Sequence, residues 1–258
     1  MREHNLKKEN VLGIDVCDIR PEKAVALSLE GIHSHELNTV FFLSARGSNY
    51  CQKTPWALDL VNSLELVVPG DRHTEMAVQH QSLPDDNGFG EFAQEFMDRF
   101  FTRMHREYRE LFITSAVKER LDGVVDYLHK MYPNISVFAM VYDAKETGAA
   151  DQLVNEINGH TPDALFLLLK PGEQLHLLRD YESMMNTGLC ICIESLKQLI
   201  IEETRPIPGW IRFLHLESVY HWFNKEERIE SQIEGNLFKK RITEDAMTDT
   251  EQYEQNKL

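Results

Sequence analysis

The stretch that decides the fold runs from Asn155 to Gln174 and reads NEINGHTPDALFLLLKPGEQ. Gly159 and Pro162 predict the end of a helix, because glycine is favoured just past a helix and proline cannot continue one. The six residues from Ala164 to Leu169 are all apolar, which is typical of a strand buried on both faces. In an open parallel sheet, ligands bind beyond the carboxyl ends of the strands. The segment from Lys170 to Gln174, directly after this strand, is therefore the first candidate for a site.

Predicted strands and helices alternate through most of the remaining chain. From residue 111 to residue 203 the pattern predicts a strand followed by a helix four times over, which requires parallel strands joined by right-handed crossovers. The first third adds predicted strands near residues 11–19, 39–44 and 64–69. We expect loops at 45–51 and 70–73, where the second and third of these strands end. The fold class predicted from this pattern is α/β, with a mostly parallel central sheet.

The C-terminal part of the chain differs in character from residues 1–205, which we assign to the α/β domain. Residues 206–242 form a predicted helical appendage, aromatic at first and then amphipathic from 225 to 242. A basic cluster, Lys239 to Arg241, lies beside the apolar stripe, and such a helix either docks on a membrane surface or packs back on its own domain. Residues 243–258 are acidic and polar, which predicts a disordered tail.

Composition excludes several classes of function. The chain has 27 Lys and Arg against 42 Asp and Glu, a formal net charge of −15, which argues against nucleic acid as a partner. Residues 1–8 lack the apolar segment of a secretory signal, so a cytoplasmic location is expected. The four cysteines are scattered and form no CxxC pair, which favours buried, reduced thiols. His33-x-His35 and His215-x-Glu217 do not form a zinc-ligand set, and neither a metal nor a cofactor is predicted.

Polar residues at two predicted strand ends are the candidates for chemistry. Asp71 follows the strand that ends at Pro69, where a carboxylate could act as a general base. Lys170, Glu173 and Gln174 follow the strand of the opening stretch. Taken alone, all four residues are equally consistent with ordinary solvated turns.

Several stretches, in the same order along the chain, resemble the bacterial glycosyltransferase family of the TagA, WecG and CpsF type, which includes N-acetylmannosaminyltransferases. The resemblance covers nearly the whole chain and rests on seven segments: Val11–Val16, Leu64–Asp71, Lys130–Pro133, Ile157–Phe166, Pro171–Gln174, Pro208–Ile211 and Leu216–His221.

The resemblance implies a Rossmann-like fold and the transfer of a sugar from a UDP-sugar to a lipid-linked acceptor, a polyprenyl diphosphate, in bacterial surface polysaccharide synthesis. It also implies work at the inner face of the cell membrane, where the segment 225–242 would make a peripheral contact. Asp71 would be the base. The implied substrate-binding residues lie in the predicted loops and the appendage: Ser44, Arg46, Lys170, Glu173, Gln174, Arg205 and Glu217.

The sequence also departs from the family pattern at the ends of the strands. The family's Asp-Gly pair is reversed here as Gly70-Asp71, and glycines expected at three other strand ends are replaced by Thr114-Ser115, Leu168–Lys170 and Ile193–Ser195. Glycines there let backbone amides approach a nucleotide closely, so the replacements would put side chains into that space. An alternative function follows: a catalytically inactive relative that binds a partner or regulates polysaccharide synthesis.

Overall fold

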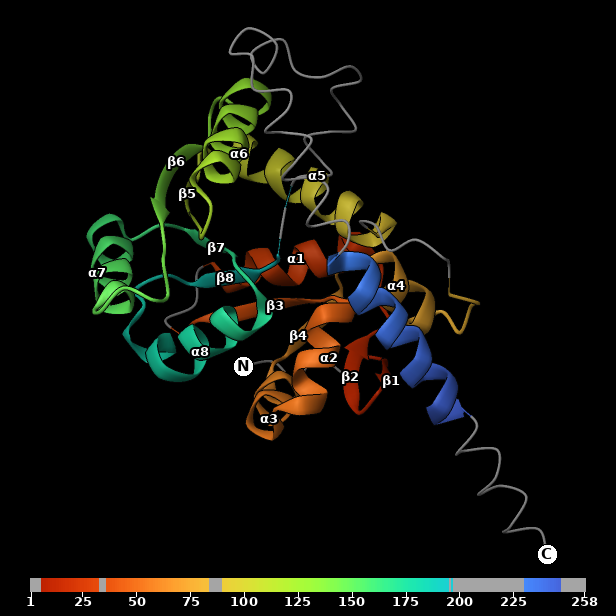
Figure 1. Cartoon of the computed structure of the whole chain (residues 1–258). Helices are drawn as coiled ribbons and strands as arrows, with labels where there is room; N and C mark the ends of the chain where they lie inside the picture. Colours follow the sequence, from red (N-terminus) through yellow and green to blue (C-terminus); the bar gives the residue numbers. More distant parts are fainter. Residues whose placement is uncertain (1–5, 33–35, 84–89, 195, 197–229, 247–258) are drawn as a thin grey trace, which may run out of the picture.

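The computed structural model describes residues 6–32, 36–83, 90–194, 196 and 230–246 (Figure 1). Their central feature is a six-stranded sheet in the order β4-β3-β8-β7-β5-β6, and every neighbouring pair in it is parallel. The strands are β3 (Asn38–Leu43), β4 (Leu66–Pro69), β5 (Glu110–Ser115), β6 (Ser136–Val141), β7 (Ala164–Leu168) and β8 (Leu189–Cys192). The predicted α/β class with a mostly parallel central sheet is confirmed.

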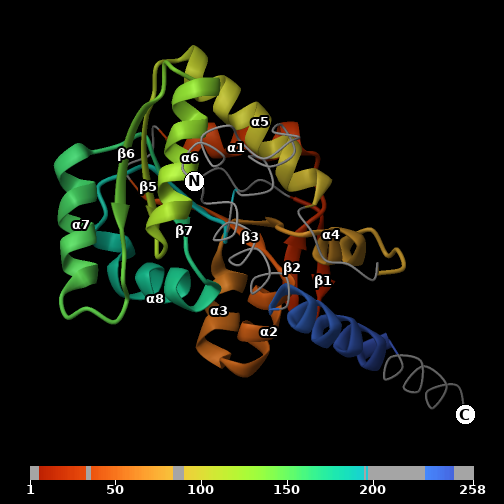
Figure 2. The same cartoon turned by 45° about the horizontal axis from the view of Figure 1, so that its top comes forward.

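Helices cover both faces of this sheet (Figures 1 and 2). One face packs against α1 (Pro21–Gly31), α5 (Glu91–Arg106) and α6 (Lys118–Met131). The other packs against α2 (Ala45–Lys53), α3 (Pro55–Ser63), α7 (Ala149–His160) and α8 (Pro171–Tyr181). A short helix, α4 (Arg72–Val78), follows β4, and a 3₁₀ turn, η1 (Glu182–Met184), follows α8.

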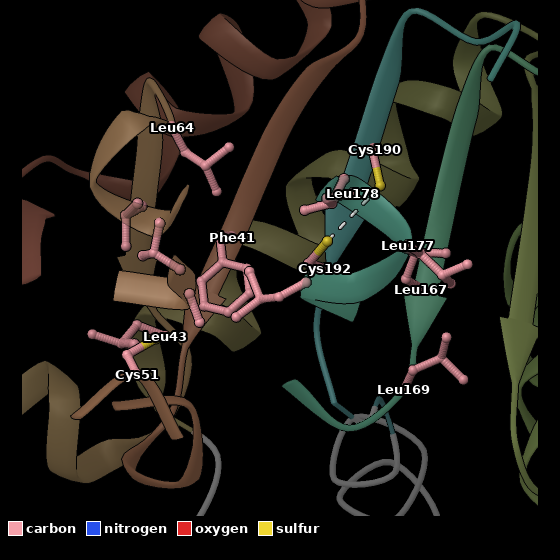
Figure 3. Close-up of a cluster of buried hydrophobic side chains, with 14 of the residues drawn as sticks. Phe41, Leu43, Cys51, Leu64, Leu167, Leu169, Leu177, Leu178, Cys190 and Cys192 are labelled. Atoms are coloured by element: carbon pink, nitrogen blue, oxygen red, sulfur yellow. Dashed lines mark hydrogen bonds between the residues drawn. The ribbon is translucent and has the colours of Figure 1, made fainter. Parts of the chain in front are cut away.

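Successive side chains of each central strand enter opposite halves of the core, as the pleat of a strand requires. Phe41 belongs to the cluster beneath α2, α3 and α8, and its neighbour Phe42 belongs to the cluster beneath α1 and α5. Figure 3 shows the first cluster, where Phe41 lies beside Cys192. The prediction of buried thiols is confirmed, because all four cysteines are buried and free.

The first predicted strand, at 11–19, is instead an antiparallel hairpin made of β1 (Lys8–Val11) and β2 (Ile14–Cys17). Leu12 and Gly13 form its turn with φ values of 52° and 77°, as the favoured two-residue hairpin turns require. A leucine is uncommon at positive φ, which is why the sequence conceals this turn. The hairpin stands apart from the main sheet, next to β4, where the Cys17 thiol lies 3.7 Å from the Glu65 carbonyl oxygen.

The helices begin closer to the strands than the sequence indicates. The segment 45–51, predicted to be a loop, belongs to α2, and the predicted loop at 70–73 contains the start of α4. Helix α8 begins at Pro171 rather than Leu175. Proline is well suited to the first position of a helix because its fixed φ is already helical. Helix α7 passes the predicted stop at Gly159 and ends at His160, and Thr161 takes the left-handed conformation with φ 47°.

The C-terminal helix, residues 230–246, packs back on the α/β domain in this structure and runs past α2 and α4 (Figures 1 and 2). Phe238 is fully buried in the core cluster on that side, while Ile233 is 61% exposed. The helix continues to residue 246, beyond residue 242, where the appendage was predicted to end and the tail to follow. The predicted domain boundary at 205/206 and the segment 225–229 lie outside the described residues.

Candidate functional site

Three neighbouring strands end at one edge of the sheet and lead directly into polar residues. Strand β3 continues into Ser44, β4 into Gly70 and Asp71, and β8 into Ile193 and Glu194. The parallel register aligns Leu43 with Pro69 and Phe41 with Cys192, so these three chain segments leave the sheet side by side. This is the edge at which ligands bind in open parallel sheets.

Asp71 ties two of these segments together. Its Oδ2 accepts a hydrogen bond from the backbone nitrogen of Ala45 at 2.7 Å, and its Oδ1 accepts one from the backbone nitrogen of Thr74 at 2.9 Å. The Thr74 side chain returns to the backbone nitrogen of Asp71 at 3.3 Å, which completes a capping box at the start of α4. Asp71 as a residue is only 8% exposed. Its carboxylate is therefore buried and fixed at the carboxyl ends of the strands, and Asp71 is not a solvated turn residue.

Gly70 sets the position of Asp71. Its backbone nitrogen donates to the Leu43 carbonyl oxygen at 2.7 Å, and a Cβ at residue 70 would stand only 2.8 Å from the Phe42 backbone. No side chain fits so close to a neighbouring strand. The reversed order Gly70-Asp71 therefore places a glycine where β4 touches β3 and moves the carboxylate one residue further, to the start of α4.

Arg46 stands on the first turn of α2 and is held by two carboxylates. Its guanidinium donates to Glu194 Oε2 at 3.1 Å and to Glu230 Oε2 at 3.0 Å, and its side chain remains 25% exposed. Ser44 caps α2 by accepting from the Gly47 backbone nitrogen at 2.9 Å, and its hydroxyl also donates to Glu194 Oε1. Ser44, Arg46 and Glu194 thus form one connected network.

The carboxyl group of Glu194 has a pKa above its ordinary value. The main cause is burial, which penalises the charged form, and the nearby carboxylates of Asp71 and Glu234 act in the same direction. Arg46 and the Ser44 hydroxyl oppose the shift without cancelling it. Glu194 therefore takes up a proton more readily than an exposed glutamate, and its hold on Arg46 weakens as the pH falls.

The C-terminal helix supplies the outer wall of this edge. Asn49 on α2 donates to the carbonyl oxygen of Glu234 at 2.9 Å and to its Oε2 at 2.7 Å. The ring of Phe238 stacks on His73 of α4 with centroids 6.2 Å apart. These contacts join the appendage to the two helices that carry Arg46 and Asp71.

The residues after β7 divide between the site and the scaffold. Lys170 is exposed next to the start of α8. Glu173 is a helix cap that accepts from the Lys170 backbone nitrogen at 3.1 Å, and Gln174 is 1% exposed and donates to the Leu167 carbonyl oxygen at 2.8 Å. Pro171 borders Gly47, so the start of α8 adjoins the start of α2. Of this predicted group, Lys170 is the side chain open to a ligand.

The side chains that replace the family's glycines mostly enter the core. Leu168, Leu169 and Ile193 belong to the two hydrophobic clusters, and Thr114 and Ser115 are also buried. Among the replacements that the structure describes, only the side chains of Lys170 and Glu194 are left outside the core, where they could enter the space expected for a nucleotide.

The structure brings together Ser44, Arg46 and Asp71 among the predicted residues, whereas Arg205 and Glu217 lie outside the described residues. The sequence did not indicate Asn49, Glu230 or Glu234 as neighbours of this edge. The signal that could have found the latter two is the four-residue spacing of Glu230, Glu234 and Phe238, which puts them on one side of a helix.

Two further properties of the described residues bear on the chemistry. Within them, no group of three or more His, Cys, Asp or Glu side chains is placed to hold a metal ion. No helix in the described ranges is both long enough and apolar enough to cross a membrane.

The fold and the strand ends described above define an α/β protein in which an arginine paired with two glutamates lies near a fixed carboxylate. The model of the Glycosyl transferase WecG/TagA/CpsF family matches residues 9–237, and the chain belongs to this family. No individual curated protein gives a significant match. Family membership supports a glycosyltransferase role in polysaccharide synthesis.

Proposed function

We propose that this protein transfers a sugar from a UDP-sugar to a lipid-linked, polyprenyl-diphosphate acceptor in the synthesis of a bacterial surface polysaccharide. The observation that carries the proposal is the convergence of Arg46 and Asp71 at the carboxyl edge of the sheet, where the Asp71 carboxylate bonds to the backbone of residue 45. A cation and a carboxylate within one strand-end site are the two groups that this reaction needs.

The reaction is a displacement at the anomeric carbon of the donor sugar. An Asp71 oxygen accepts the proton of the acceptor hydroxyl, whose oxygen forms a bond to that carbon. The bond from the carbon to the diphosphate breaks, and its electron pair leaves with UDP. Arg46 and the backbone N–H groups at the start of α2 would stabilise the charge that develops on the diphosphate.

The donor diphosphate would enter by replacing a carboxylate. Arg46 is shared between Glu194 and Glu230, and Glu230 is the more exposed partner, at 54% against 23% for Glu194. An exposed ion pair contributes roughly 0–1 kcal/mol, so exchanging Glu230 for a phosphate is energetically accessible. Lys170, exposed at the neighbouring start of α8, would supply a second positive charge.

A lipid-linked acceptor implies that the sugar transfer takes place at the inner face of the cell membrane. Because Phe238 is buried against the domain, a peripheral contact through the segment 225–242 would use the outward side of the helix. That side carries Ile233, 61% exposed, and Lys240, whose side chain is 71% exposed. An apolar residue and a lysine on one exposed helix face are suited to binding the surface of an anionic membrane.

A second candidate function, a catalytically inactive family member that binds or regulates, is favoured by one specific observation. Both oxygens of Asp71 accept hydrogen bonds from backbone nitrogens, so the carboxylate already has a structural role as a helix cap. A base must be able to turn a lone pair toward the acceptor hydroxyl.

Thermal unfolding in the presence of UDP and of UDP-sugars tests the donor class. A ligand at about 100 times its dissociation constant adds about 2.7 kcal/mol to the free energy of unfolding. We expect a rise in melting temperature for the wild type, a much smaller rise for Arg46→Ala, and an unchanged rise for Arg106→Ala, an exposed arginine on α5. No rise with any UDP-sugar at millimolar concentration would contradict the enzyme proposal.

A further inference from the structure

The two outermost strands of the central sheet, β4 and β6, are built differently. At one edge, β4 has four residues, all buried, ends in Pro69 and lies beside the β1–β2 hairpin. At the other edge, β6 pairs with β5 over six consecutive residues, from Glu110 with Ser136 to Ser115 with Val141. None of the β6 residues is buried, and Val141 is 40% exposed. Figures 1 and 2 show β6 at the outer margin of the sheet.

Strand β6 lacks the features that natural proteins use to protect a sheet edge. Its sequence SVFAMV contains no charge, proline or glycine, and its register with β5 runs without a bulge. Such an edge exposes backbone N–H and C=O groups in the geometry that another strand requires. Among the described strands, β5 alone pairs with β6.

The charge pattern around β6 favours a second copy of this chain as the occupant. The protein carries a net charge of −15 and is 27% charged, yet no residue from Met131 to Tyr142 is charged. Two copies would therefore meet at this edge without opposing like charges, in contrast to most of the surface. A two-fold axis normal to the sheet also makes the contact between two antiparallel copies of the same strand self-complementary.

We propose that the protein forms a two-fold symmetric dimer by antiparallel pairing of β6 with β6 of a second copy, which joins the two sheets into one. The backbone nitrogens of Ser136 and Tyr142 donate to the carbonyl oxygens of Arg109 and Ser115, toward β5. The alternate residues Val137, Ala139 and Val141 therefore turn their N–H and C=O groups outward, and antiparallel pairing requires such residues to lie opposite one another. The two-fold pairing places Ala139 opposite Ala139, and Val137 opposite Val141, of the second copy. The partially exposed Met140 and Val141 side chains are covered by this pairing. Because a single strand pair is a small interface, the dimer dissociates on dilution.

The test is sedimentation velocity of the full-length protein over a range of concentrations, from about 1 to about 200 μM, which spans the affinities expected of small interfaces. The wild type is expected to shift from monomer to dimer across this range. Val141→Lys and Ala139→Glu should each weaken dimerisation at least about tenfold, because the first puts a charge on an apolar strand pair and the second puts two like charges opposite each other. Ile233→Lys, which adds the same charge on the C-terminal helix, serves as the matched control and should dimerise as the wild type does.

An equimolar mixture of Ala139→Glu and Ala139→Lys tests the register. In the proposed pairing residue 139 lies opposite residue 139 of the other copy, so the mixed dimer has an opposite-charge pair where each variant alone has a like-charge pair, and dimerisation should recover. A wild type that stays monomeric throughout overturns the proposal. So does a dimer that Val141→Lys weakens no more than Ile233→Lys, and failure of the mixture to recover overturns the register.

Discussion

The Oδ2 atom of Asp71 lies 2.7 Å from the backbone nitrogen of Ala45, so a residue after β4 caps the chain where it leaves β3. The other carboxylate oxygen caps α4 through Thr74. One side chain thus fixes the relative position of the starts of α2 and α4. The same edge carries Arg46, and the proposed chemistry depends on this fixed arrangement.

Removal of the Asp71 carboxylate should destabilise the protein as well as the site. We expect Asp71→Ala to lower the free energy of unfolding by about 1–3 kcal/mol, because it removes a helix cap and leaves buried backbone donors without acceptors. Urea denaturation measures this change. Asp59→Ala, at an exposed position on α3, is the control and should change stability by less than about 0.5 kcal/mol. Equal effects of the two substitutions would contradict the capping role.

Asp163, from one of the segments that resemble the family, has a structural role at the amino ends of the strands. It accepts from the Arg109 guanidinium at 3.0 Å and from the Glu110 backbone nitrogen at 2.8 Å, which ties the amino ends of β5 and β7 together. Asp163→Ala should cost about 1–3 kcal/mol of stability and leave UDP binding unchanged. Asp122→Ala, which removes an exposed ion pair with Lys118, should cost less than about 1 kcal/mol. Weaker UDP binding in Asp163→Ala would contradict the structural assignment.

The strands of the second half were predictable because they combine strong apolar runs with clear stops. The segment from Ala164 to Leu169 is buried throughout, as its sequence requires. Helix α2 was missed because its buried face consists of small and polar residues, including Gly47, Ser48 and Asn49, rather than an apolar stripe.

Part of the candidate site could be predicted, because Ser44 ends a predicted strand and Arg46 and Asp71 lie just after the ends of predicted strands. The partners of Arg46 could not be predicted in the same way. Glu194 and Glu230 reach it from distant parts of the chain, and no local pattern encodes which cation a surface glutamate will meet. The surface on which the amphipathic helix packs could not be predicted either, because it depends on the tertiary contact between Phe238 and His73.

The raised pKa of Glu194 predicts a specific pH dependence of stability. Because burial raises the folded-state pKa above the unfolded value, the folded protein binds this proton more tightly than the unfolded chain does. The resulting stabilisation is complete below the unfolded pKa and is lost as pH rises through the folded pKa. Relative to Glu194→Gln, the wild type should therefore gain stability as pH falls from about 7 to about 4.5. Urea denaturation across this range measures the difference.

The matched control for this pH dependence is Glu119→Gln, at an exposed position on α6. It should leave the slope of stability against pH as it is in the wild type. Parallel curves for the wild type and Glu194→Gln would show that the carboxyl of Glu194 titrates alike in the folded and unfolded states, contrary to this prediction.

Phe238 should hold the C-terminal helix on the domain. Its side chain is fully buried, and truncation of a buried phenylalanine to alanine typically costs about 3–5 kcal/mol of stability. Because Phe238 belongs to the C-terminal helix, this loss should mainly weaken the packing of that helix on the domain. Phe238→Ala should make residues 230–246 a site of rapid proteolysis while the strands and helices between residues 90 and 194 stay resistant. Ile233→Ala, at an exposed position of the same helix, should be cleaved at the wild-type rate. Equal protection of both variants would exclude this role of Phe238.

The most direct measurement of the central claim is the release of UDP from UDP-sugars by the purified protein, with and without a polyprenyl-diphosphate-linked acceptor. The account predicts acceptor-dependent release by the wild type and a loss of about 10²-fold or more in Asp71→Asn, since a general base typically contributes that much. A protein that binds UDP but releases none from any UDP-sugar and acceptor would contradict the transferase and identify the inactive, binding member of the family instead.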